Sequence, residues 1–244
     1  MDVAAHSQEA ADNAAAEADS YMNVGEPRAY RAAADASSNA GSLTSAFLHD
    51  PLLRTLMPNE EAFRTLGRRT LATLTWALDA SYGLTDVICD EAGVVVCTAI
   101  WEPAGMTCGA LCRFVLMSLW MVCVLGLRRA FCVAGMLLAF ETRRHQHAPT
   151  AHHLQLLGTR QSEQSRGVGS KLIQVGIRRA EKLGLPCYLE ASNERSVPFY
   201  KRHGFKVVET YYHFEGGVDG DGNRIVGRGP VVTLMFRPLG GVAH

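Results

Sequence analysis

The sequence lacks the features that mark nucleic-acid-binding, disulfide-bonded or secreted proteins. Its 24 Lys and Arg residues are balanced by 24 Asp and Glu residues, so no overall charge attracts nucleic acid or anionic lipid. Seven cysteines form an odd set with no Cys-x-x-Cys pair, and Cys108 and Cys112 lack partners at zinc-site spacing. No basic segment followed by an apolar core opens the chain. We therefore expect reduced, buried thiols and a cytoplasmic protein.

No apolar run reaches the roughly 20 residues that a helix needs to span a bilayer. The stretch 114–127 carries no charge, and a second apolar run, 130–140, follows Arg128 and Arg129. We expect two helices packed on a sheet, lining part of a ligand mouth with Met117, Trp120 and Met121. A hairpin that crosses or rests on a membrane is the alternative, and we do not expect a membrane partner.

The first 40 residues have almost no large apolar side chains and are rich in Ala, Asp, Glu, Ser and Asn. Such a composition cannot bury enough surface to offset its ordering entropy. We expect a disordered tail over 1–40 and one folded domain over 41–240. In that domain a short helix near Ser42 ends at Asp50-Pro51, and Asn59 caps a longer helix that reaches about Ala80.

Two antiparallel strands are predicted at 84–89 and 93–101, and a central strand at 153–158, because both of its faces are mostly apolar. Four histidines lie nearby, at 145, 147, 152 and 153. Their spacing fits no pair of metal ligands on one helix face, and Pro149 interrupts the segment. We expect solvated histidines in a loop and at a strand entry, and no metal.

A glycine loop follows the central strand. Gln164 to Gly169 reads Gln-x-x-Gly-x-Gly and leads directly into an amphipathic helix that ends at Gly184. Amides in the first turn of a helix have no partner inside the helix and bind anions. The order Gly169-Ser170-Lys171 excludes a P-loop, and Leu172 stands where a dinucleotide fingerprint needs a third glycine. A helix start that only packs tightly is the alternative.

The residues that follow the loop resemble those of a known protein family. A second strand at 185–191 precedes Pro198-Phe199-Tyr200 and Gly204-Phe205. Together with the loop, these motifs resemble the GCN5-related N-acetyltransferases (GNAT), and most of all their puromycin N-acetyltransferase-like branch, over residues 43–239. The resemblance implies an α/β fold with a mixed, mostly antiparallel sheet that splays between its fourth and fifth strands and has helices on both faces.

The resemblance also implies an activity, the transfer of an acetyl group from acetyl-CoA to a primary amine by direct attack. Tyr200 would then be the general acid for the leaving thiolate, a role that suits a phenol. Glu190 is the first candidate for the general base, and His152 or His153 the second. The implied cofactor-binding residues lie at the strand end (Leu157, Gly158, Thr159), in the loop (Gln164, Ser165, Arg166, Gly167, Val168, Gly169, Ser170) and beyond the second strand (Asn193, Ser196, Phe199).

Some positions depart from the family pattern. Ser165 stands where the family commonly has Gly, and Ser196 where an Asn often contacts the cofactor, so that Asn193 takes over that contact. Because the loop from Thr159 to Ser165 is altered, a catalytically weak acyl-CoA-binding regulatory module is the alternative function. The acceptor is expected to be a small molecule or peptide amine with an apolar body, and the protein a monomer or homodimer.

Overall fold

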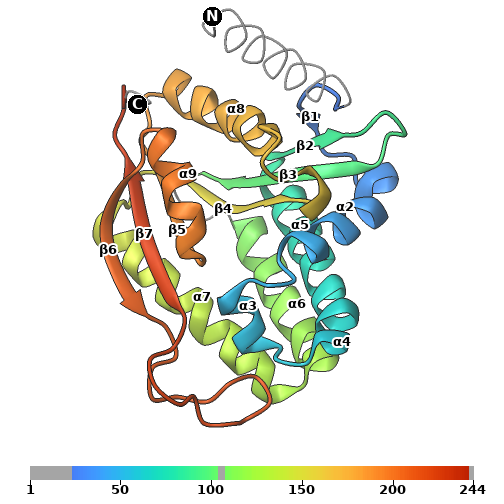
Figure 1. Ribbon diagram of the computed structural model, residues 1–244, viewed down its shortest axis with the longest axis vertical. Coiled ribbons are helices and arrows are strands. Elements are labelled where there is room, and N and C mark those ends of the chain that lie inside the picture. The colour runs from blue at the N-terminus through green and yellow to red at the C-terminus, as the bar shows by residue number, and fades with distance from the viewer. Residues whose placement is uncertain (1–23, 104–107, 242–244) are drawn as a thin grey trace, which may run out of the picture.

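The computed structural model describes residues 24–103 and 108–241 and is built around a seven-stranded sheet with helices on both faces (Figure 1). The strands run in the order β1-β2-β3-β4-β5-β7-β6, and only β4 and β5 pair in parallel. This confirms the expected mixed, mostly antiparallel sheet. The strands are β1 (Arg28–Ala29), β2 (Thr85–Cys89), β3 (Val95–Glu102), β4 (His152–Thr159), β5 (Cys187–Ala191), β6 (Lys206–Tyr212) and β7 (Val231–Arg237).

The two parallel strands separate after three paired residues. β4 and β5 are in register only from His152↔Cys187 to Leu154↔Leu189, after which β4 continues to Thr159 paired with β3 alone. At the point of separation β4 carries an extra residue, because Ile100 opposes Leu156 while Trp101 opposes Leu154. Such a bulge bends a strand. The second half of β4 therefore has one edge without a neighbouring strand.

One face of the sheet is covered by α8 (Val168–Lys182) and α9 (Val197–Arg202). α8 buries one stripe of side chains against β3 and β4, as its amphipathic spacing predicts. Gly176 lies so close to Trp101 that a Cβ there would come within 2.0 Å of the indole ring. The absence of a side chain at this helix-interior glycine thus sets how closely α8 approaches the sheet.

The opposite face is covered by the N-terminal helices and by a helical hairpin. Asn59 caps the first turn of the predicted long helix by accepting from the amide of Ala62 at 2.9 Å, and that helix continues through a π-helical turn to Tyr82. The two expected helices of the apolar region form the hairpin. The elements are α2 (Ala32–Ala46), α3 (Pro51–Leu56), α4 (Glu60–Ala62), η1 (Phe63–Gly67), α5 (Arg68–Tyr82), α6 (Cys108–Leu125) and α7 (Leu127–His147), with 3₁₀ turns η2 (Gln161–Glu163) and η3 (Glu194–Ser196) elsewhere.

The expected boundary of the disordered tail is wrong for residues 24–40, which form β1 and most of α2. The polar side chains of this segment find buried partners that its composition does not reveal. Arg28 forms a two-pronged ion pair with the buried Asp35, with both distances 2.8 Å, and the buried Asn39 accepts from the Thr98 hydroxyl. These pairs replace the apolar burial that the segment lacks. Residues 1–23 lie outside the described part of the chain.

The expectation of solvated histidines before the central strand is also wrong for two of the four. α7 extends to His147, and His152 and His153 are buried in β4. His152 stacks on Trp101 under α8, whereas His153 faces the helical hairpin side. Consecutive residues of a strand point to opposite faces of the sheet, so a central strand buries both.

Candidate active site

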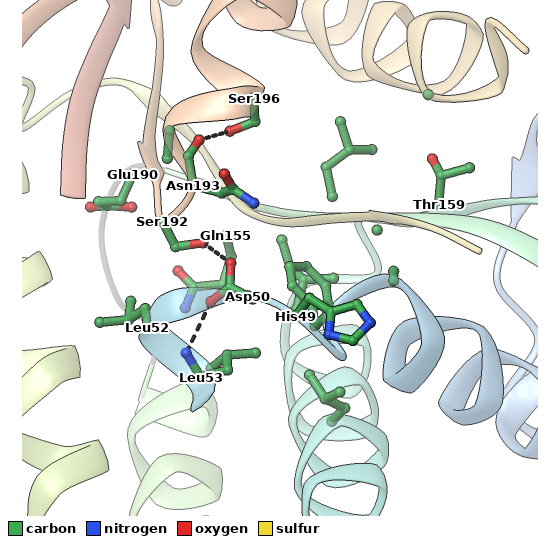
Figure 2. Close-up of a pocket in the computed structure, with 18 of the residues that line it drawn as sticks. His49, Asp50, Leu52, Leu53, Gln155, Thr159, Glu190, Ser192, Asn193 and Ser196 are labelled. Atoms are coloured by element: carbon green, nitrogen blue, oxygen red, sulfur yellow. Dashed lines mark hydrogen bonds between the residues drawn. The ribbon is translucent and has the colours of Figure 1, made fainter. Parts of the chain in front are cut away.

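A cavity of about 990 Å³ occupies the opening between β4 and β5 (Figure 2). Its walls come from the second half of β4, the end of β5, the loop before α8, and helices α3, α5, α7 and α9. Ligand pockets in proteins commonly measure about 300–1,000 Å³. The volume thus has room for a cofactor arm and a second, smaller molecule.

The glycine loop forms one end of this cavity. Ser165 and Gly167 both have left-handed backbones, with φ of 64° and 73°, and Gly167 directly precedes α8. A Cβ at Gly169 would touch the Thr159 hydroxyl at 3.3 Å and the Phe199 ring at 3.7 Å. The first-turn amides of α8 therefore lie beside the end of β4, where an anionic group can approach them.

The unpaired edge of β4 forms the long wall of the cavity. Leu157, Gly158 and Thr159 line it beyond the last pair with β5. Close packing explains why residue 158 is a glycine, because a Cβ there would come within 2.8 Å of Leu43 and 2.9 Å of Phe47. An extended chain placed along this edge would meet backbone amides and carbonyls at the spacing of a missing strand.

The structure brings the residues implied for the cofactor into one place. All of them line the cavity except Arg166, whose guanidinium donates to Glu163 at 2.7 Å. Asn193 accepts from the amide of Arg195 and thereby caps η3, and the Ser196 hydroxyl donates back to the Asn193 carbonyl at 2.6 Å (Figure 2). The two positions at which the chain departs from the family pattern, Ser165 and Ser196, remain part of the wall. The chain thus fits a phosphate-bearing cofactor with an extended arm.

Tyr200 faces the cavity from α9. Its ring packs edge-on against Phe199 and Phe205, and no hydrogen bond joins its hydroxyl to another described residue. Burial raises the pKa of Tyr200 well above its ordinary value, and the carboxylate of Asp50 adds to the rise. The phenol is therefore protonated throughout the neutral range and can donate its proton.

Glu190 lines the cavity at the end of β5 and is tied to a buried histidine. Its Oε2 lies 2.6 Å from His153 Nε2, while His153 Nδ1 lies 3.3 Å from a carboxylate oxygen of Glu102. Burial alone lowers the pKa of His153, but the two carboxylates outweigh it and raise the pKa to about 10. The imidazole is thus a cation held between two carboxylates. The second oxygen of Glu190 has no partner among the described residues.

Neither histidine suits the role of base that was considered for it. His153 is already protonated at neutral pH, and only its Glu190 neighbour lines the large cavity. His152 lies on the other face of the sheet, stacked on Trp101 with ring centroids 5.0 Å apart. Burial and the positive charge of Arg179 lower its pKa to about 4, so it is neutral but out of reach of the cavity.

A second buried carboxylate, Asp50, lies in the cavity and was missed as a site residue. One of its oxygens caps α3 by accepting from the Leu53 amide at 2.9 Å, and the other accepts from the Ser192 hydroxyl at 2.6 Å (Figure 2). Burial raises the pKa of Asp50 above its ordinary value, and these hydrogen bonds offset only part of the rise. From the sequence, Asp50-Pro51 indicates only the end of a helix, whereas in the structure Asp50 caps the start of α3 and also lines the cavity.

The other half of the cavity is apolar. Among the lining residues that the N-terminal segment and the hairpin supply, only His49 and Asp50, directly before α3, have ionisable side chains. A smaller cavity of about 250 Å³ adjoins this half at Leu74, Leu137, Phe140 and Gln155. Of the three mouth residues expected in the hairpin, Met121 lines the large cavity and Met117 the small one. The apolar lining consists of Leu52, Leu53, Leu56, Met57, Phe63, Leu71, Leu74, Met121, Val133, Met136, Leu137 and Phe140.

Comparison with known proteins finds a family match over part of the chain. Residues 93–205 match the model of the acetyltransferase (GNAT) family. Among curated proteins, the mycothiol acetyltransferase of Streptomyces avermitilis is 33% identical over 79 residues, which make up 31% of this chain and 26% of the relative. The chain therefore spans about a quarter of the length of the curated relatives it matches.

Solved structures with the same fold cover most of the chain. A Corynebacterium glutamicum protein described as histone acetyltransferase HPA2 and related acetyltransferase superposes with a TM-score of 0.58 at 22% identity, over 89% of this chain and 97% of its own. A mosquito arylalkylamine N-acetyltransferase-like protein superposes with a TM-score of 0.61 at 13% identity, over 88% and 99%. At such identities the likeness shows the fold, which is the GNAT fold.

Proposed function

Because residues 93–205 match the GNAT acetyltransferase family and the whole described chain has its fold, we propose that this protein is an acetyl-CoA-dependent N-acetyltransferase. The observation that carries the proposal is the single cavity in which the first-turn amides of α8, the unpaired edge of β4 and the Tyr200 hydroxyl meet. GNAT enzymes use acetyl-CoA as a cosubstrate, which supplies the acetyl thioester.

Different residues along the cavity bind the cofactor and assist the transfer. The amides from Ser165 to Ser170 hold the pyrophosphate of the cofactor, and the backbone of Leu157 to Thr159 pairs with its pantetheine arm. A backbone amide of this β4 edge polarises the thioester carbonyl. Tyr200 donates its proton to the departing thiolate, because burial keeps the phenol protonated. No cysteine side chain is needed for the transfer.

The acceptor amine must lose a proton before or during its attack, and two buried carboxylates can take it. Glu190 lines the cavity with one oxygen bound to the His153 cation. That oxygen of Glu190 is therefore already engaged by the histidine ring. Asp50 has the raised pKa and is the carboxylate that acts electrostatically on Tyr200. We therefore assign the base to Asp50, with Glu190 as the second candidate.

The apolar half of the cavity supports one class of acceptor. Apart from His49 and Asp50 before α3, its lining offers no charged partner for a polyanion or a polycation, whereas an amine with an apolar body would bury that body among Leu, Met and Phe side chains. The neighbouring carboxylates Asp50 and Glu190 would attract the ammonium group of such a molecule. A small lipophilic amine fits better than a peptide, because a peptide brings backbone groups that this apolar lining cannot satisfy.

The test is turnover by the purified protein. Release of free thiol from acetyl-CoA, together with a mass gain of one acetyl group on members of a lipophilic amine panel, is the expected result. A rise in melting temperature with CoA but no product from any amine would instead support the weak acyl-CoA-binding module. Placement in the puromycin N-acetyltransferase-like branch remains part of this proposal and predicts acetylation of aminonucleoside-type amines in the same panel.

A further inference from the structure

The cavity of about 250 Å³ beside the large one, called the small cavity from here on, combines an apolar wall with a group of charged side chains. It lies between α5, α6 and α7 and is closed by the end of β3 and the start of β4. Leucines of α5 and α7, together with Met117 and Phe140, supply most of the wall. The small cavity is therefore built like a ligand pocket, which is mostly apolar with a few polar groups.

The small cavity opens to solvent along α7. Leu138, which lines it, is 68% exposed, and Ala134, one helical turn earlier, is exposed as well. The charged side chains Arg144 and His153, which also line it, are buried. A solute can thus enter from the surface of the protein and reach polar groups inside without passing through the large cavity.

The charges that line the small cavity cancel in pairs. Arg144 donates from Nε and Nη2 to the two oxygens of Glu141, at 2.9 and 2.7 Å. The His153 cation lies with Nδ1 3.3 Å from a carboxylate oxygen of Glu102. Two cations thus face two carboxylates, as is usual for buried charges. Neither an anion nor a cation is needed to balance the site, which favours a neutral ligand.

One strong donor in the small cavity is left without a partner. Arg144 is only 7% exposed, and its Nη1 is buried with no hydrogen-bond partner among the described residues. A buried donor without a partner is costly, so native structures almost always supply one. Glu102 acts electrostatically on Arg144, and its carboxylate has a single hydrogen-bond partner in the described part of the chain, His153. A hydroxyl group can accept from the guanidinium and donate to the free carboxylate oxygen at once.

We propose that the small cavity binds a neutral small molecule with an apolar body and one hydroxyl group, a phenol or an alcohol. The hydroxyl accepts from Arg144 Nη1 and donates to Glu102, while the body packs among the leucines, Met117 and Phe140. The volume lies near the lower end of the range of about 300–1,000 Å³ that is common for ligand pockets, so the molecule is small. This site does not rest on the proposed acetyltransferase function.

The small cavity is next to the large one but has its own polar residues. Leu74, Leu137, Phe140 and Gln155 line both cavities, whereas Arg144, Glu102 and His153 line only the small one. Through the 2.6 Å contact of His153 Nε2 with Glu190, a molecule bound there lies one side chain away from the large cavity. Changes at Arg144 or Ala134 therefore alter the small cavity and leave the lining of the large one intact.

Isothermal titration of the full chain without acetyl-CoA tests the proposal, so the result is independent of the proposed function. The probes are 4-ethylphenol, ethylbenzene, which lacks the hydroxyl, and 4-ethylbenzoate, which is an anion. We expect 4-ethylphenol to bind about tenfold or more tightly than ethylbenzene, because ethylbenzene leaves Arg144 Nη1 unpaired. The anion should bind more weakly than 4-ethylphenol, since its charge would lie beside Glu102 and Glu141.

Three variants locate the bound molecule. Arg144→Lys keeps a positive charge beside Glu141 and removes the Nη1 donor, so the preference for 4-ethylphenol over ethylbenzene should fall to about twofold or less. Ala134→Trp places a large side chain at the mouth and should weaken both ligands by about tenfold. Thr142→Trp is the matched control, because Thr142 is exposed on the same helix and lines neither cavity. Melting temperatures show that each variant is folded.

Three results would overturn the proposal. Equal affinity for 4-ethylphenol and ethylbenzene, or no binding of either, would mean that a water molecule alone satisfies Arg144 Nη1. Undiminished binding in Ala134→Trp would place the molecule outside the small cavity. Tighter binding of 4-ethylbenzoate than of 4-ethylphenol would show that the pocket selects an anion and not a neutral hydroxyl compound.

Discussion

The hydroxyl of Ser192 donates a 2.6 Å hydrogen bond to the buried carboxylate of Asp50 and so joins the end of β5 to the start of α3. The two residues are separated by 142 positions in the chain. Both residues line the cavity, and the bond fixes the Asp50 carboxylate within it (Figure 2). Under the proposed function, this carboxylate of raised pKa is the group that takes the proton of the acceptor amine.

Asp50→Asn should abolish most of the acetyltransferase activity while the fold persists. The amide oxygen of Asn can still accept from the Leu53 amide, so α3 keeps its cap, and the NH2 group can donate to the Ser192 hydroxyl oxygen in place of the present bond. Loss of a general base costs about 10²–10⁴-fold in rate. We expect kcat/KM to fall by that amount in Asp50→Asn and by about tenfold or less in Glu190→Gln. A larger loss in Glu190→Gln, measured under the same conditions, would transfer the role of base to Glu190.

Tyr200→Phe should reduce kcat by about 10²-fold or more, because the proton donor for the thiolate is lost. The phenol makes no hydrogen bond to a described residue, and the remaining ring still packs on Phe199 and Phe205. The melting temperature and the affinity for CoA should therefore change little. Isothermal titration with CoA and steady-state rates separate the two effects. As a control, Tyr212→Phe on the exposed strand β6 should leave kcat unchanged. Undiminished turnover in Tyr200→Phe would show that Tyr200 is not the general acid.

The cation at His153 should make stability depend on pH in a defined window. Its folded-state pKa of about 10 lies above the ordinary value of 6.5. The free energy it contributes is therefore complete below pH 6.5 and is lost as the pH rises toward 10. Denaturant unfolding of the unchanged protein and of His153→Gln should show a stability difference that shrinks across this window. A constant difference would contradict the ion pair with Glu190 and Glu102.

Gly176→Ala should destabilise the protein, whereas Gly135→Ala should not. A Cβ at position 176 would overlap the indole of Trp101, which is itself fully buried and cannot move away. Overpacking of a core costs about 1–3 kcal/mol and more where no relaxation is possible. Gly135, inside α7, has nothing within 4 Å of the same atom, and alanine favours helix by about 1 kcal/mol. Thermal unfolding should show a lower melting temperature for Gly176→Ala and an equal or higher one for Gly135→Ala. Equal changes in melting temperature would show that α8 can shift away from the sheet.

The features read correctly from the sequence are those that a short stretch of chain decides. The glycines at 167 and 169 predicted a tight turn into a helix, and Gly167 does take a left-handed backbone at that place. Asn59 predicted a helix start and caps one. The alternation and length of the apolar runs predicted β2, β3, β4 and β5 with small errors at their ends. Local backbone preferences and hydrogen-bonding capacity act over a few residues, so the sequence displays them directly.

The features missed from the sequence depend on partners that are distant in the chain. The composition of α2 resembles a disordered tail until Asp35 meets Arg28 and Asn39 meets Thr98. His153 looks like a solvated strand-end residue until Glu102 on β3 and Glu190 on β5 enclose it. The apolar run of the hairpin does not tell which of its residues face outward.

The sequence by itself determined the order of strands and helices from α4 to α9, the glycine loop and the position of the tyrosine on α9, because each follows from the chemistry of neighbouring residues. Only the tertiary structure decided which charged groups became buried together and which apolar faces stayed exposed. The physical reason is that pKa values, ion pairs and burial depend on what surrounds a side chain in space. At Asp50 that environment is supplied by Ser192, from the far end of the domain.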